Sequence, residues 1–122
     1  MTDFVRVLVV EDQPLIAMDL EDLLISRGYE VLGPVATVAA ALDRLAATTP
    51  DAALLDIDLA GETSFAVGFE LARRGVPFVF ATGTSGTDGG VPEALADRAV
   101  IHKPWDVDDV LSFLGEHALR RR

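Results

Sequence analysis

The chain contains no cysteine, few basic residues and no long apolar run. Without cysteine it can form neither a disulfide framework nor a thiolate metal site. Only 10 Lys and Arg residues face 20 Asp and Glu residues, for a net charge of −10. This argues against direct binding to nucleic acid or to anionic lipid, because both require a basic face.

No apolar stretch approaches the roughly 20 residues that cross a bilayer. The first residues also lack the basic and then apolar pattern of a secretory signal, so we expect a cytoplasmic protein. The length of 122 residues, half of them hydrophobic, suits one compact domain over residues 1–122. Such a domain leaves no room for an output domain, so we expect it to act through contact with other proteins, as a monomer or weak dimer.

Short β-branched and apolar segments alternate with helical patterns along the chain. Strands are expected over residues 5–10, 29–32, 52–57, 76–81 and 99–102, and the second of them should end at Gly33–Pro34. Helices are expected to begin near Pro14, Thr37, Ser64 and Asp106. This alternation predicts right-handed crossovers and a parallel sheet that is covered on both faces.

Polar residues follow the expected strands at the point where each ends. They are the pair Glu11–Asp12, then Asp56, Thr82 and Lys103. The carboxyl ends of parallel strands share one edge, so these residues should lie in one pocket. Crowded carboxylates repel one another unless a cation lies among them, and carboxylate oxygens suit Mg²⁺. Asp56 could then be a nucleophile that forms an acyl phosphate, with Thr82 and Lys103 contacting the phosphoryl oxygens.

Each of these residues alone has an ordinary structural interpretation. Glu11–Asp12 suits a helix N-terminus, Asp56 a turn, Thr82 a loop cap and Lys103 a surface charge. Their joint placement at strand ends favours the functional interpretation.

These residues, with Pro104 after Lys103, resemble the motif of response-regulator receiver domains, and the resemblance covers essentially the whole chain. Residues 77–83, Pro-Phe-Val-Phe-Ala-Thr-Gly, resemble more specifically the subgroup of stand-alone receivers with a Phe-Ala-Thr-Gly motif. The resemblance implies an α/β, flavodoxin-like, doubly wound five-stranded parallel sheet of order 2-1-3-4-5. It also implies a signalling protein rather than an enzyme.

The resemblance further implies that Asp56 receives a phosphoryl group from a histidine kinase or phosphotransfer protein, with Mg²⁺ as cofactor. Asp12, Asp56 and the backbone carbonyl of Asp58 would bind the ion, and Glu11 would act through water. The Lys103–Pro104 bond is expected to be cis.

The chain departs from the receiver pattern at two positions. Many receivers place an aromatic residue where this chain has Val100, and a proline where it has Ala60. A ring rotation at Val100 is therefore excluded as the switch. The glycine-rich loop over residues 82–92, with a short helical turn over residues 93–96, is expected to be mobile until Asp56 is phosphorylated.

Two alternatives remain open. Asp56-Ile57-Asp58, Thr82-Gly83-Thr84, Lys103 and the pair Asp108–Asp109 also resemble the aspartyl-phosphate phosphatases related to haloacid dehalogenases. The additional strand before Asp56 and the helical setting of Asp108–Asp109 argue against that class. The other alternative is a receiver-like interaction module that is never phosphorylated.

Several large apolar residues are interpreted as core, and Trp105 as packing near the last helix. The core set is Met18, Phe65, Phe69, Phe78 and Phe80.

Overall fold

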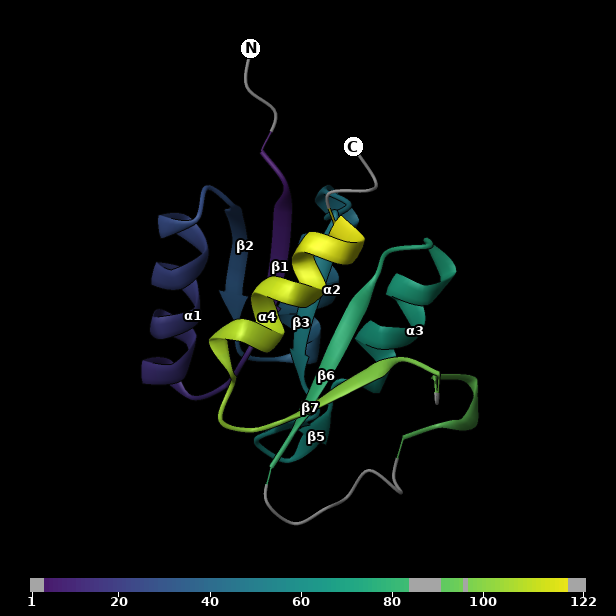
Figure 1. Cartoon of the computed structure of the whole chain (residues 1–122). Coiled ribbons are helices and arrows are strands. Elements are labelled where there is room, and N and C mark those ends of the chain that lie inside the picture. Colours follow the sequence, from purple (N-terminus) through teal and green to yellow (C-terminus); the bar gives the residue numbers. More distant parts are fainter. Residues whose placement is uncertain (1–3, 84–90, 96, 119–122) are drawn as a thin grey trace.

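A computed structural model describes residues 4–83, 91–95 and 97–118. Its centre is a parallel sheet of order β2-β1-β3-β6-β7 (Figure 1). The strands are β1 (Arg6–Val10), β2 (Glu30–Val35), β3 (Ala52–Asp56), β6 (Phe78–Thr82) and β7 (Ala99–His102). In chain order this is 2-1-3-4-5, so the predicted doubly wound flavodoxin-like sheet is confirmed.

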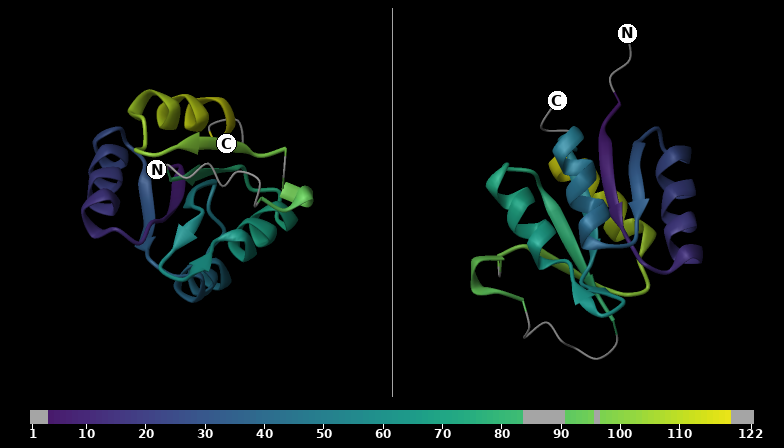
Figure 2. Two further views of the ribbon diagram at one scale, coloured as in Figure 1. Left: turned by 90° about the horizontal axis from the view of Figure 1, so that it is seen from below. Right: turned by 180° about the vertical axis from the view of Figure 1, so that it is seen from behind.

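Helices cover both faces of the sheet (Figure 2). Leucines of α1 (Pro14–Ser26) and Val110 and Phe113 of α4 (Val107–Phe113) pack on one face, and α4 continues into a π-helical turn, η3 (Leu114–Ala118). On the other face lie α2 (Val38–Ala47) and α3 (Phe65–Arg73). Val7 and Val9 of β1 pack against α1 and α4, and Leu8 and Val10 pack against α2 and α3, because successive side chains of a strand point to opposite sides.

The prediction that Gly33–Pro34 ends the second strand is wrong. β2 continues to Val35, with a bulge opposite β1 and a cis Gly33–Pro34 bond. Gly33 has φ +103°, and a Cβ there would lie 2.8 Å from the backbone nitrogen of Val35. The edge position of β2 tolerates a proline that cannot donate to the ladder. Val35 then accepts the backbone N–H of Glu11 at 2.9 Å, which fixes the start of the acidic pair.

Two of the residues interpreted as core lie on the surface. Met18 is 56% exposed, because α1 turns Ala17, Leu20 and Leu24 toward the sheet instead. Phe69 is 44% exposed, because its neighbour Gly68 is the residue that faces the sheet. The aromatic residues at 65, 78 and 80 do pack together as expected, edge to face.

A small hairpin follows β3 and was not predicted. It consists of β4 (Asp58–Leu59) and β5 (Glu62–Thr63), paired antiparallel. Glu62 accepts the first backbone N–H of α2, from Val38, at 3.1 Å. The backbone N–H of Ala60 donates to Asp12 Oδ2, also at 3.1 Å. The hairpin therefore joins the end of β1 to the start of α2.

The expected helical turn appears as the 3-10 helix η2 (Glu93–Leu95). Residues 84–90 and 96 of the expected mobile loop lie outside the described residues, so its mobility stays a prediction. In the part of the chain that the structure describes, no helix is long and apolar enough to cross a membrane.

Candidate functional site

The residues predicted to form a pocket follow neighbouring strands at one edge of the sheet. Glu11 and Asp12 come directly after β1, and Asp56 ends β3, whose Leu55 pairs with Val10. Thr82 ends β6, next to the residue that pairs with Asp56, and Lys103 directly follows β7. The parallel topology thus places all of them at the carboxyl edge, where α/β sheets bind ligands.

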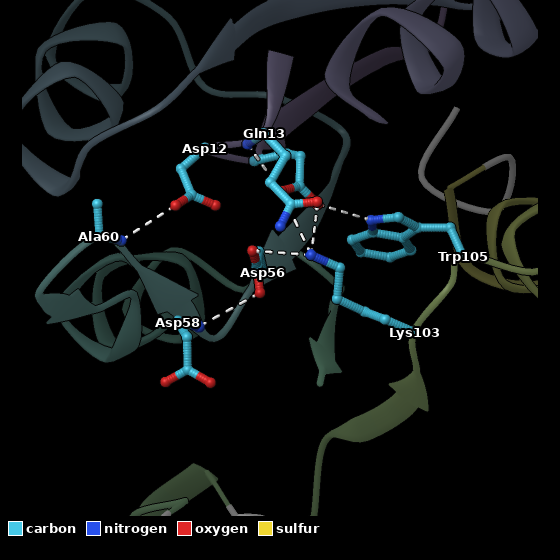
Figure 3. A network of polar contacts seen from close by, with 8 residues as sticks. Asp12, Gln13, Asp56, Asp58, Ala60, Lys103 and Trp105 are labelled. Carbon is cyan, nitrogen blue, oxygen red and sulfur yellow. Dashed lines mark hydrogen bonds and ion pairs between the residues drawn. The ribbon is translucent and has the colours of Figure 1, made fainter. Parts of the chain in front are cut away.

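Asp56 is buried in this pocket, with 3% of its surface exposed. Its Oδ2 lies 3.1 Å from the ammonium of Lys103, and its Oδ1 accepts the backbone N–H of Asp58 at 3.3 Å (Figure 3). Burial and the neighbouring Glu11 raise the pKa of Asp56 to about 7, against the opposing effect of Lys103. The one neighbouring ammonium, that of Lys103, does not offset the cost of burying the ionised form of Asp56 beside a second carboxylate.

Lys103 spans two carboxylates. Its Nζ lies 3.0 Å from Glu11 Oε1 and 3.1 Å from Asp56 Oδ2. Burial acts to lower the pKa of Lys103, but the hydrogen bonds to Glu11 and Asp56 outweigh it, so the pKa is raised. The backbone N–H of Lys103 donates to the carbonyl of Thr82 at 2.8 Å. The Lys103–Pro104 bond is cis, which confirms that prediction.

The side chain of Glu11 is fully buried and accepts hydrogen bonds from several groups. Besides Lys103 it accepts the backbone N–H of Gln13 and the indole N–H of Trp105, each at 3.1 Å. The contact between Glu11 and Trp105 was not predicted from the sequence. The only feature of the sequence that points to this contact is the position of Trp105 two residues after Lys103. An indole N–H whose ring is buried needs a hydrogen-bond acceptor nearby.

Asp12 is partly exposed and Asp58 is exposed. Glu11, Asp12 and Asp56 each offer a carboxylate oxygen, and these three atoms lie within 4.8 Å of one another. The Asp58 carboxylate points away from this group in Figure 3, so only its backbone is near Asp56. Thr82 is fully buried.

The donor set fits a hard cation. Three carboxylates share the pocket with the single ammonium of Lys103, so negative charge is in excess when all are ionised. Carboxylate oxygens are the ligands that suit Mg²⁺, which is commonly held by one or two carboxylates and waters. Asp12 and Asp56 would hold such an ion, with Glu11 beside it.

The sheet order and the acidic pocket at its carboxyl edge define a flavodoxin-like α/β protein of the receiver class. The chain belongs to the response regulator receiver domain family, whose model matches residues 7–114. The family is one of two-component signalling proteins.

Known relatives agree with this assignment. The solution structure of SdrG from Sphingomonas melonis Fr1 is 46% identical, with a TM-score of 0.77, and the match covers 94% of this chain and 97% of that one. The phyllosphere-induced regulator PhyR of Methylorubrum extorquens is 36% identical over 125 residues, which cover 95% of this chain and 46% of PhyR. The transcriptional regulatory protein PdtaR of Mycobacterium tuberculosis is 30% identical over 110 residues, which cover 87% of this chain and 53% of PdtaR. The chain thus spans about half the length of these two curated relatives.

The phosphatase alternative is not favoured. The family match concerns signalling receivers. Asp108 and Asp109 lie exposed in the first turn of α4 rather than directly after a strand, and the cluster of carboxylates consists of Glu11, Asp12 and Asp56 without them.

Proposed function

We propose that the chain is a phosphoryl-accepting switch, with Asp56 as the acceptor. The observation that carries the proposal is the Lys103 ammonium held 3.1 Å from a buried Asp56 in a chain of the receiver family. The phosphoryl donor would be the phosphohistidine of a histidine kinase or phosphotransfer protein.

In this reaction a carboxylate oxygen of Asp56 bonds to phosphorus while the phosphorus–nitrogen bond of the donor breaks, and the electron pair stays on the histidine nitrogen. The ammonium of Lys103, a compact positive charge on a flexible side chain, offsets the negative charge of the incoming phosphoryl group. The Thr82 hydroxyl donates a hydrogen bond to a phosphoryl oxygen. When bound, Mg²⁺ supplies charge neutralisation for the phosphoryl oxygens and the carboxylates. Asp12, Asp56 and the Asp58 carbonyl are its proposed ligands, with Glu11 acting through water.

We also propose a setting for this reaction. Residues 77–83 resemble the Phe-Ala-Thr-Gly subgroup of stand-alone receivers, so residues 1–122 would act as a single receiver domain in the cytoplasm, where kinases supply phosphoryl groups. Phosphorylation would change binding to a downstream protein, not to nucleic acid or a membrane, in keeping with the net charge of −10. The domain would be a monomer or weak dimer that catalyses no turnover of other substrates.

Intact-mass analysis after incubation with acetyl phosphate and Mg²⁺ tests the proposal. The expected result is that the parent chain gains one phosphoryl group. Asp56→Asn, and the parent chain in the presence of EDTA, should gain none. Continued hydrolysis of a small phosphate ester by the pure protein would support the phosphatase alternative instead. A parent chain that never gains mass would support the unphosphorylated interaction module.

A further inference from the structure

Trp105 joins the acidic site to an apolar pocket. It is the single tryptophan of the chain. Its ring lines a pocket between α1 and α4, together with Ile16, Leu20 and Val110. Its Nε1 lies 3.1 Å from Glu11 Oε1, and Figure 3 places the indole across the polar network from Asp12. Apolar packing of the ring thus fixes where its one N–H donor lies.

The other side-chain donor to Glu11 in the described part of the chain is not fixed in this way. The Lys103 ammonium sits on a four-carbon stem and is divided between Glu11, at 3.0 Å, and Asp56, at 3.1 Å. The Glu11 side chain is 0% exposed, so water cannot readily replace a donor that leaves. A buried carboxylate that loses a donor is strongly destabilised. The backbone N–H of Gln13 donates to the other oxygen, Oε2, so Glu11 opposes any movement of Lys103 away from Oε1 unless a second donor remains on Oε1.

We propose that Trp105 is a positioning residue for phosphoryl transfer. Its indole N–H keeps Glu11 hydrogen-bonded and oriented while Lys103 turns from Glu11 to the phosphoryl group on Asp56. Without that N–H, Glu11 holds Lys103 more tightly and transfer slows. Trp105 touches no reacting atom and acts only through Glu11. This inference rests on the proposed function of Asp56.

A double-mutant cycle tests the inference. The rate of Asp56 labelling by acetyl phosphate with Mg²⁺ is measured in the parent, Trp105→Phe, Glu11→Gln and the double variant. Phenylalanine keeps an aromatic ring in the pocket and removes the N–H. We expect Trp105→Phe to slow labelling about tenfold in the parent, which corresponds to the lower end of the energy of a hydrogen bond to a charged group, and to reach the same final stoichiometry. In the Glu11→Gln background the same change should alter the rate by less than about twofold.

Ile16→Val is the matched control, since it alters packing in the same pocket without removing a donor. It should label at the parent rate. Equal slowing by Trp105→Phe in both backgrounds would mean that the ring acts by packing, and this would overturn the inference. So would an unchanged rate of Trp105→Phe in the parent background.

The indole N–H gives a readout that does not depend on phosphorylation. Because the chain has one tryptophan, its ¹⁵N-labelled indole gives one resonance. That resonance should shift upfield in Glu11→Gln and stay in place in Ile16→Val. If Asp56 is labelled normally but the resonance ignores Glu11→Gln, only the role of Trp105 fails. If the parent is never labelled, the proposed function fails and the role of Trp105 in transfer fails with it.

Discussion

Replacing Asp56 by asparagine keeps the shape of the side chain and removes its charge, so it isolates the cost of ionising this carboxyl in the pocket. Asp56 is 3% exposed, and burial and Glu11 raise its pKa from 3.8 to about 7. Between these two pH values the folded chain binds more protons at this site than the unfolded chain does. The contribution of Asp56 to the free energy of unfolding should therefore be highest below about pH 4 and be lost as the pH rises through about 7.

The size of the effect follows from the shift. About three pKa units, each about 1.4 kcal/mol, correspond to a loss of about 4 kcal/mol in the free energy of unfolding. A domain of this kind has about 5–15 kcal/mol in all, so the loss is large. Asp56→Asn does not titrate, so it should match the parent near pH 4 and exceed it by up to about 4 kcal/mol at pH 8.

Urea denaturation in EDTA at several pH values measures this difference, and the comparison with the variant cancels the other titrating groups. Adding Mg²⁺ at pH 8, at about 100 times its dissociation constant, should raise the free energy of unfolding of the parent by about 2.7 kcal/mol. The same addition should stabilise Asp56→Asn less. A parent chain that gains stability relative to Asp56→Asn between pH 4 and 8 in EDTA would refute the reasoning.

Two further predictions concern the metal ligands and the core. Asp12→Ala should weaken Mg²⁺ binding more than Glu11→Ala, because only Asp12 is expected to contact the ion; equal losses in calorimetric titration would contradict this assignment. Gly68→Ala should cost about 1–3 kcal/mol in denaturation, because the added Cβ would lie 2.9 Å from the ring of Phe80. Gly115→Ala meets no atom within 4 Å and should cost nothing; equal losses in the two glycine variants would show that packing at position 68 is not the cause.

The sequence pattern was enough to predict the parallel sheet and the proximity of the polar residues that form the pocket. Each strand and helix has its own periodicity, and parallel topology then brings the ends of distant strands to one edge. The positions of Glu11, Asp56 and Lys103 follow from that rule alone. Their chemical roles remain predictions.

Other features depend on contacts that no local pattern encodes. Gly33–Pro34 normally ends a strand, yet β2 continues because it lies at the sheet edge and Gly33 adopts a positive φ. Met18 has the composition of a core residue but lies on the outer side of α1. The hydrogen bond between Trp105 and Glu11 joins residues 94 positions apart, and only the side-chain packing reveals it.

The most direct test of the account is to locate the phosphoryl group. The parent chain would be labelled with acetyl phosphate and Mg²⁺, then reduced with borohydride, which converts an aspartyl phosphate to homoserine, and mapped by peptide mass spectrometry. The account predicts homoserine at position 56 and an unchanged Asp58 as the internal control. Modification at Asp12 or Asp58, or a label that survives in Asp56→Asn, would contradict it.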